Sequence, residues 1–452
     1  TVGTPDTNGN KKGTFSAWIK RSNVDTEQAF YVTRTNGSNF VRFRFLDTNY
    51  INITSNTSGT NYYATTNRLF RDTSAWYHIV VAYDTTQASS SDRIKMYVNG
   101  TQQTFSASNY PSQNATLYML ASGQPQRIGQ ESGNAYFDGY MTHVHYTEGH
   151  AYAASTFGET DSTSGIWVPK TAPSVTYGTN GFFLKFENGA AMGTDSSGQS
   201  NTFTVNNSVT QNVDSPTNNV CVWNRSFLTR HHNESTSIPG MLQNGNTTFN
   251  STANAFYGFR AATIAITKGK WYWENKIIDN GRMYIGICYP NILQKIHTPF
   301  YDSSTHMAVT LDNSGSIQGI NGDSSSSGVS FANNDIIGFA LDMDNKGLYV
   351  HKNGTYVLSG NPASGASLTG SVIEPLSGTK EQYLGNGDFV SPVVGDPSST
   401  GTFLVNSNFG SGFFGTTAVA SANADANGQG AFEYAVPSGY YTLNTKNLKE
   451  FG

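Results

Sequence analysis

Residues 335–355, DIIGFALDMDNKGLYVHKNGT, decide the fold of this chain. An apolar strand, a polar turn and a second strand lead to Asn353-Gly354, which predicts a tight hairpin because a type I′ turn needs φ > 0 at both central positions. The same order of strand, loop, strand and turn ends earlier at Asn99-Gly100. These two copies predict two antiparallel β-domains in one chain.

The composition favours the same fold class. A length of 452 residues suggests two or three domains. Apolar residues make up 37% of the chain, aromatic residues 13% and charged residues 13%. The remainder is rich in Gly, Ser, Thr and Asn, which suits short strands joined by turns and suits long helices poorly. We therefore predict an all-β protein.

Charge and hydropathy exclude several classes of partner. The formal net charge is −4, and the sequence has no basic run that would neutralise a row of phosphates, so nucleic-acid binding is not expected. The sequence also has no apolar stretch near the ~20 residues that span a bilayer, so membrane insertion is not expected. The two cysteines, Cys221 and Cys288, are predicted to be buried free thiols.

Alternation marks strands in the first region, residues 1–170. The stretch FVRFRFL at 40–46 alternates strictly, with Phe43 and Phe45 on one face. Arg42 and Arg44 take the other face, so this strand should have one face in water. The stretch WYHIVVAY at 76–83 is nearly all apolar, and we expect a central strand covered on both faces.

Four blocks in this region resemble the laminin-G-like, concanavalin A-type jelly roll, a β-sandwich. They are GTFSAWIKRSN at 13–23, WYHIVVAYDTT at 76–86, RIKMYVNGT at 93–101 and RIGQESGNAYFDGYMTHVHYTEG at 127–149. In that family a further strand usually precedes the first block, where this chain has a short stub beginning at Thr1. The resemblance thus leads us to expect additional sequence upstream.

Residues 171–217 are expected to form a short structured connector, because 181–187 (GFFLKFE) reads as a strand. The region 218–452 resembles a SPRY domain, again a β-sandwich, with a C-terminal tail. Its matching blocks are GKWYWENKI, YIGICY, NNDIIGFALDMDNKGLYVHKNG and FLVNSNFG. Trp271 and Trp273 should share a face, and we expect 283–288 to be the hairpin partner of their strand. The overall prediction is two antiparallel β-sandwich domains in tandem.

The C-terminal stretch resembles bacteriophage virion proteins, especially those of marine phages. This resemblance rests on PSGYYTLNTKNL at 437–448, FGETDSTSGIWVPK at 157–170 and TDSSGQSNTFTVNN at 194–207. It implies a tail or fibre component of a virion, assembled in a bacterial cytoplasm and exposed on the particle.

No catalytic residues are predicted. Glycan cleavage needs two carboxylates flanking the scissile bond, and the nearest pair, Asp342-x-Asp344, reads better as an Asx turn at a strand end. Glu131, Asp138 and Glu148 lie too far apart in the sequence to define a site. There is also no GxSxG motif to hold a nucleophilic serine. We therefore expect a protein that is not an enzyme.

No metal or cofactor is predicted either. His231-His232 reads as part of a solvated loop. His143 and His145 share a face of one expected strand and are the best metal candidates, although a half-exposed sandwich face explains them equally well. The family resemblance leaves Ca²⁺ open at Asp138, where a structural role beside a glycine bend is favoured.

Ligand recognition is expected on loops at the rim of the SPRY domain. Those loops are 225–250, 289–306 and 357–390, and tyrosines in them offer a flat apolar face and a hydroxyl group. The candidate binding residues are Arg230, His231, His232, Asn233, Tyr289, Tyr301 and Asp302.

The sequence supports one leading hypothesis and three alternatives. The leading one is a non-enzymatic virion protein that recognises glycans on the host surface, strengthened by many copies per particle. The expected partners are other virion proteins, a host glycan or receptor, and further copies of the chain in a homo-oligomer. The alternatives are a capsid or tail subunit with an assembly role only, a glycan depolymerase, and an extracellular adhesin of a cellular organism.

Overall fold

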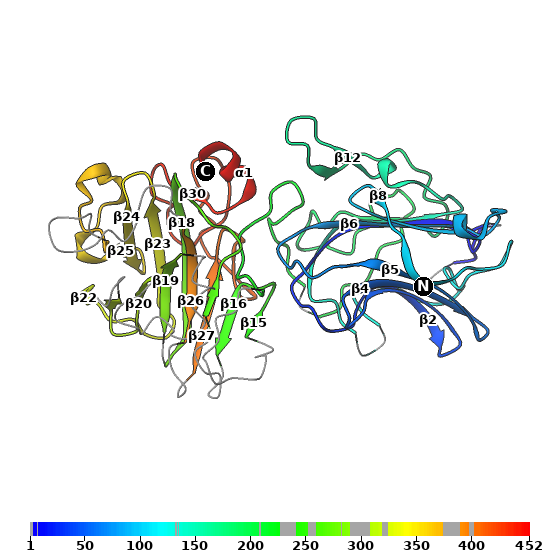
Figure 1. The fold of residues 1–452 in the computed structure, drawn as a ribbon, viewed down its shortest axis with the longest axis horizontal. Helices are drawn as coiled ribbons and strands as arrows, with labels where there is room; N and C mark the ends of the chain where they lie inside the picture. Colours follow the sequence, from blue (N-terminus) through cyan, green and yellow to red (C-terminus); the bar gives the residue numbers. More distant parts are fainter. Residues whose placement is uncertain are drawn as a thin grey trace. The chain divides into compact units, whose positions relative to one another are not determined.

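The structure is a computed structural model, which describes residues 3–6, 8–131, 133, 135–207, 209–226, 241–251, 259–281, 283–289, 308–318, 324–373, 389–396 and 402–452. It divides into two compact units, Thr1–Gln211 and Asn212–Gly452 (Figure 1). Each unit is a sandwich of mainly antiparallel sheets, so the predicted all-β class is confirmed. No helix in the described part of the chain is long and apolar enough to span a membrane.

The first unit contains two large sheets. Their strand orders are β14-β11-β1-β6-β7-β8 and β10-β2-β3-β4-β5-β9, and β12 and β13 form a separate hairpin. The strands are β1 (Lys12–Arg21), β2 (Gln28–Asn36), β3 (Asn39–Phe45), β4 (Tyr50–Thr57), β5 (Thr60–Leu69), β6 (Tyr77–Asp84), β7 (Ile94–Val98), β8 (Thr101–Gln102), β9 (Phe105–Asn109), β10 (Gln126–Ile128), β11 (Gly139–Glu148), β12 (Gly158–Thr160), β13 (Trp167–Pro169) and β14 (Phe182–Leu184). Short 3-10 helices lie at η1 (Ser90–Asp92) and η2 (Ala154–Thr156).

The core of the first unit lies between these two sheets. Phe15 of β1 packs on Phe43 of β3 with their rings 5.5 Å apart, edge to face. Ile79 and Val81 of β6 belong to the same buried cluster. β1, β3 and β6 each contribute every second residue to it, as the pleat requires, whereas β2 contributes the consecutive Phe30 and Tyr31 beside a register shift.

The outer face of the sheet that contains β6 is covered by the segment after β11. Trp18 stacks on His78 at 4.7 Å, and the Trp167 indole N–H donates to His78 Nδ1 at 2.9 Å. Phe157 packs on Val80 in the same layer. Every residue of β6 is buried as a result, which confirms that this strand is covered on both faces.

The second unit also has two large sheets. Their orders are β15-β16-β27-β18-β23-β24-β25, with β30 parallel to β18, and β17-β26-β19-β20-β21-β22. The strands are β15 (Leu242–Gln243), β16 (Thr248–Ser251), β17 (Phe259–Ala261), β18 (Lys270–Asn280), β19 (Tyr284–Cys288), β20 (Ala308–Leu311), β21 (Ser316–Gln318), β22 (Ser324–Ser326), β23 (Ile336–Asp342), β24 (Gly347–Lys352), β25 (Thr355–Tyr356), β26 (Ser391–Gly395), β27 (Phe403–Asn408), β28 (Phe413–Phe414), β29 (Thr417–Ala418) and β30 (Tyr441–Thr442). The 3-10 helices η5 (Val357–Ser359) and η6 (Pro362–Ser367) and the helix α1 (Thr445–Phe451) complete it.

The pairing of β18 corrects one expectation. Trp271 and Trp273 share the core face as predicted, but β18 pairs with β23 and β27 rather than with β19. β19 lies in the other sheet, between β20 and β26. Ile285 and Ile287 bury their side chains in the same core as the two tryptophans. The two strands therefore meet face to face, and the predicted hairpin is wrong.

The segment expected to be a separate connector belongs largely to the first unit, which extends to Gln211. Within it, β14 pairs with β11, placing Phe182 opposite Tyr146. Asp195 accepts a hydrogen bond from the Phe183 backbone N–H at 2.8 Å and so holds the following loop against this edge strand. Sheet pairing makes this segment part of the first sandwich. Cys221 and Cys288, in the second unit, are buried thiols outside any disulfide, as predicted.

Both predicted Asn-Gly turns are present, with positive φ at all four residues. Each asparagine also binds the backbone of a residue near the start of a neighbouring strand, the one that pairs with the strand leading into the turn. Asn99 N–H donates to His78 O at 2.9 Å, and Asn99 Oδ1 accepts from His78 N–H at 2.7 Å. Asn353 makes the same two bonds with Ile336, both at 2.8 Å. The turn thereby fixes the register of each hairpin.

Removing this side chain should destabilise the first unit. Asn99→Gly keeps a backbone that tolerates φ > 0 but loses the bond to His78, and should cost about 1 kcal/mol of unfolding free energy. Asn99→Ala adds backbone strain and should cost about 2 kcal/mol in total. Urea unfolding of the two variants and the wild type measures the contribution of the side-chain hydrogen bond and the cost of the backbone strain. Equal stability of Asn99→Gly and the wild type would show that the side-chain bond contributes nothing.

Candidate functional site

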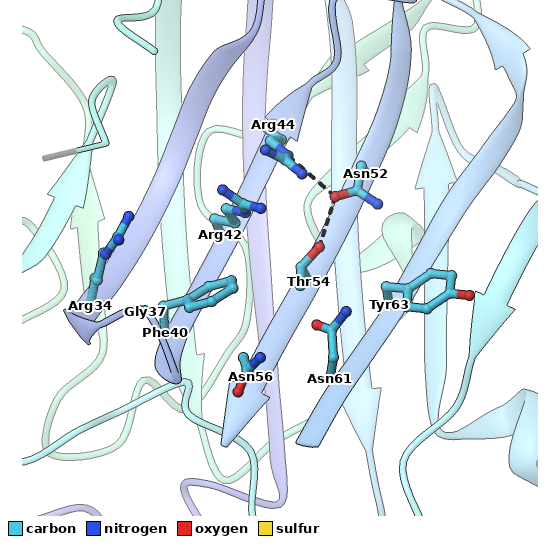
Figure 2. Close-up of a pocket in the computed structure, with 10 residues that line it drawn as sticks. All are labelled: Arg34, Gly37, Phe40, Arg42, Arg44, Asn52, Thr54, Asn56, Asn61 and Tyr63. Atoms are coloured by element: carbon cyan, nitrogen blue, oxygen red, sulfur yellow. Dashed lines mark hydrogen bonds between the residues drawn. The ribbon is translucent and has the colours of Figure 1, made fainter. Parts of the chain in front are cut away.

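A polar pocket of about 460 Å³ lies on the outer face of the sheet formed by β10, β2, β3, β4, β5 and β9 (Figure 2). Its size falls within the roughly 300–1,000 Å³ typical of sites for small ligands. Four neighbouring strands and the β2–β3 turn contribute to it. The lining residues are Arg34, Gly37, Phe40, Arg42, Arg44, Asn52, Thr54, Asn56, Asn61 and Tyr63.

Strand alternation places these side chains. On β3, Phe40, Arg42 and Arg44 line the pocket, while the intervening Val41 and Phe43 are fully buried in the core. The face of β3 that the sequence predicts to be in water is thus the pocket floor. Sequence reasoning found the alternation but did not assign a site to it, because the partners on other strands were not known.

The next strand follows the same rule. Asn52, Thr54 and Asn56 of β4 line the pocket, whereas Ile51 and Ile53 enter the core. The antiparallel register sets Asn52 opposite Arg44 and Thr54 opposite Arg42. Cationic side chains therefore face amides and hydroxyls across one strand spacing, about 4.8 Å.

Two carboxylates hold the arginines in place. Arg34 Nη1 lies 2.6 Å from Glu131 Oε1, and Arg42 Nη1 lies 3.3 Å from Glu131 Oε2. The Glu131 side chain is only 3% exposed. Arg44 Nη1 lies 2.5 Å from Glu27 Oε1. Neither glutamate lines the pocket.

Further contacts set the orientation of each guanidinium group. The Phe40 ring lies 4.9 Å from the Arg42 guanidinium and 5.9 Å from that of Arg34. Arg44 Nε donates to Asn52 Oδ1 at 3.3 Å, and Thr54 Oγ donates to the same oxygen at 2.8 Å (Figure 2). Burial lowers the pKa of Arg42, and the nearby charge of Arg44 lowers it further.

The lining supplies hydrogen bonds and positive charge. It contains three guanidinium groups, three amides, a threonine hydroxyl and Tyr63, and none of the residues named as its lining carries a carboxylate. Glycoside cleavage by the usual route needs a carboxylic acid and a carboxylate on either side of the bond. This arrangement is suited to holding a polar ligand.

The sequence-predicted binding residues lie elsewhere. Arg230, His231, His232, Asn233, Tyr301 and Asp302 fall outside the described residues. Tyr289 directly follows β19 and is half-buried against the core of the second unit. Its role in recognition stays a prediction, as does that of the other six.

The best metal candidates have structural contacts instead. His145 is buried, stacks on Phe183 at 3.8 Å and bonds through Nδ1 to the Tyr177 hydroxyl at 3.0 Å. Burial holds the pKa of His145 well below its usual value. His143 sits at a register shift of β11 with φ of +48°. Among the described residues no group of three His, Cys, Asp or Glu side chains is placed to hold a metal ion.

The Asx-turn interpretation of Asp342 is confirmed. Its Oδ1 accepts from the backbone N–H groups of Asp344 at 3.1 Å and Asn345 at 2.9 Å. Its Oδ2 pairs with Lys270 Nζ at 2.9 Å. The carboxylate is fully buried by these contacts.

A buried serine–histidine pair in the first unit also has the wrong protonation for catalysis. Ser16 Oγ lies 2.9 Å from His78 Nε2. Because the Trp167 N–H donates to His78 Nδ1, the ring proton of neutral His78 is on Nε2 and points at the serine. Burial lowers the pKa of His78 to about 3. The ring therefore cannot accept the serine proton.

The second unit contains a buried hydrogen-bonded chain on the outer face of β18. Glu274 accepts from the Tyr272 hydroxyl and from the backbone N–H groups of Glu433 and Tyr434, all at 2.9 Å. The Tyr272 hydroxyl also lies 2.7 Å from His351 Nε2. The side chains of Tyr272, Glu274 and His351 are buried, and burial raises the pKa of Glu274 to about 7.

This carboxyl group should make stability depend on pH. The pKa of Glu274 is raised from 4.5 to about 7 on folding, so between these values the folded state holds a proton that the unfolded state has lost. Stability should therefore fall as pH rises from about 5 to about 8, by at most about 3 kcal/mol. Urea unfolding at several pH values measures the slope. Glu274→Gln should reduce it, and Glu159→Gln, at an exposed position, should not.

Two family models match this sequence. Residues 1–149 match the concanavalin A-like lectin/glucanases superfamily, and residues 270–369 match the SPRY domain. Both domains expected from the sequence resemblance are therefore found. No curated protein shows a significant match. Nothing in these comparisons indicates a virion protein.

Similarity to solved structures is weak. The SPRY domain of human HERC1 is 16% identical, with 36% of this chain and 87% of that chain covered and a TM-score of 0.25. Domain 4 of AbnA, a GH43 extracellular arabinanase from Geobacillus stearothermophilus in complex with arabinotriose, is 17% identical, with 31% and 63% covered and a TM-score of 0.25. A protein from Bacteroides ovatus described as carbohydrate-binding is 17% identical, with 44% and 53% covered and a TM-score of 0.31. This chain covers less than two thirds of the length of the arabinanase domain and of the Bacteroides ovatus protein. TM-scores this low carry no argument about function.

Proposed function

We propose that this protein binds a saccharide in the polar pocket of its first unit and does not cleave it. The observation that carries the proposal is the composition of the pocket: amides, a hydroxyl and guanidinium groups converge on one space beside Tyr63. Sugar hydroxyls need many short polar contacts, and a tyrosine offers an apolar face with a hydroxyl group. The match of residues 1–149 to the concanavalin A-like lectin/glucanases superfamily supports the same class of ligand.

The positions of the carboxylates support the proposal of binding without cleavage. Glu131 and Glu27 are in ion pairs with arginines and are not among the lining residues. A pair of carboxylates facing each other across a bound sugar is therefore not offered by the lining. We therefore favour the lectin role of the superfamily over the depolymerase alternative.

Replacing Tyr63 should test the pocket directly. Tyr63→Ala should weaken binding of the best saccharide on a glycan array by about tenfold, since aromatic contacts contribute about 0.5–1.5 kcal/mol beyond their buried area. Tyr136→Ala is the matched control, because Tyr136 is 53% exposed and does not line the pocket. Calorimetric titration of both variants gives the affinities.

The same saccharide should stay intact. Incubation with the wild-type protein should release no new reducing ends. Turnover that is lost on replacing a single glutamate would reverse the proposal and favour the depolymerase. Unchanged affinity in Tyr63→Ala would place the saccharide outside the pocket.

The wider setting proposed is a virion tail or fibre that recognises host-surface glycans, supported by the resemblance of 437–448 to bacteriophage virion proteins. Many copies per particle would convert weak single-site binding into stable attachment. Electron microscopy of particles, with this chain located by antibody labelling, should show the pocket face accessible on a projecting structure. A location buried by neighbouring subunits would favour the assembly-only role.

A further inference from the structure

The pocket has two chemically different sides. Its β2–β3 side carries Arg34, Arg42 and Arg44. Its β4–β5 side carries amides and a hydroxyl, with Tyr63 at the far end (Figure 2). The amides and the hydroxyl of the second side can both donate to and accept from neutral sugar hydroxyls, whereas guanidinium groups can only donate. The first side is built for a ligand that also carries negative charge, since guanidinium groups bind carboxylate and sulfate oxygens in a fixed fork geometry.

The charges on the arginine side do not cancel. Arg34 and Arg42 share one carboxylate, that of Glu131, and Arg44 pairs with Glu27. Three guanidinium groups thus meet two carboxylates, which leaves one positive charge in excess. The buried Nε of Arg42 has no hydrogen-bond partner within the described residues. The excess charge is therefore concentrated at the Arg34–Arg42 pair.

At the Arg34–Arg42 pair the geometry presents the cations, and not their shared carboxylate, to a ligand. The Arg34 side chain is 34% exposed and that of Arg42 is 24% exposed, whereas that of Glu131 is 3% exposed. The order is reversed at Arg44, whose side chain is 13% exposed beside a Glu27 side chain that is 38% exposed. Arg34 and Arg42 are therefore the two cations open to an anion. Phe40 lies against both guanidinium groups and limits their motion. An incoming anion would meet two preorganised donors in a partly desolvated pocket, where a charged hydrogen bond is stronger than in open solvent.

We infer that the ligand of this pocket is an anionic saccharide, whose carboxylate or sulfate group is held by Arg34 and Arg42 while its hydroxyls meet the β4–β5 side. This inference rests on the proposed function of saccharide binding. Carboxylate and sulfate present the same oxygen chemistry to a guanidinium group. Polymers that carry one or the other group distinguish a carboxylate ligand from a sulfate ligand.

Matched polysaccharides test the charge requirement with the full-length protein. Polygalacturonate is compared with its methyl-esterified form, and carrageenan with its desulfated form, by calorimetric titration. At least one charged polymer should bind about tenfold or more tightly than its neutral partner. Binding of polygalacturonate identifies a carboxylate ligand, and binding of carrageenan identifies a sulfate ligand. The affinity of the protein for the charged polymer that binds should fall as salt is raised from about 0.1 to about 1 M.

Three variants locate the effect. Arg34→Gln should weaken binding of the charged polymer about tenfold, and Arg34→Lys should recover part of the loss by restoring the charge without the fork. Arg71→Gln should bind as the wild type does, because Arg71 is exposed and does not line the pocket. An equal loss in Arg34→Gln and Arg71→Gln would assign the binding to overall charge and overturn the inference.

The outcomes separate the inference from the proposed function. A neutral saccharide that binds through Tyr63 and is unaffected by Arg34→Gln would overturn the anionic ligand and leave saccharide binding in place. If no saccharide, charged or neutral, binds in a manner sensitive to Tyr63→Ala, both ideas fail together.

Discussion

This structure depends on one constraint: the side chains of a β-strand alternate between its two faces, and one of those faces is buried in the core. On β3, Val41 and Phe43 must lie in the core, so Arg42 and Arg44 must lie on the outer face. The register of neighbouring strands then decides which side chains meet there. A slip by one residue would exchange core and pocket, so the stability of the sandwich and the composition of the pocket are maintained by the same pairing.

The outer faces of the sheets differ in what covers them. In the first unit, Phe157 and Trp167 pack over one sheet and close it, whereas the other sheet carries the pocket. In the second unit, Phe432 and Tyr440 pack over Tyr272 on the outer face of β18. Apolar outer faces are covered by returning segments because exposed apolar area is costly. The charged outer face of β3 needs no such cover, and it lines an open polar pocket.

The arginine cluster shows how a charged site is maintained on a sheet. Burying a guanidinium group is costly unless a carboxylate and further hydrogen bonds compensate for lost water. Glu131 supplies this compensation for two arginines from a position close behind them, at 3% exposure. Because Glu131 is almost fully buried while Arg34 and Arg42 are partly exposed, the cations stay accessible to solvent. Under the proposed function, structural support and ligand recognition would fall to different residues of one cluster.

The sequence by itself determined the features with short-range causes: the Asn99 and Asn353 turns, the alternation of β3 and the buried central strand β6. Only the tertiary structure decided that β19 faces β18 across the core and that Glu131 meets Arg34, 97 positions away. Turn geometry and side-chain alternation are set by neighbouring residues and can be read locally. Pairings between distant strands depend on closing long loops around a common core, which no local pattern encodes.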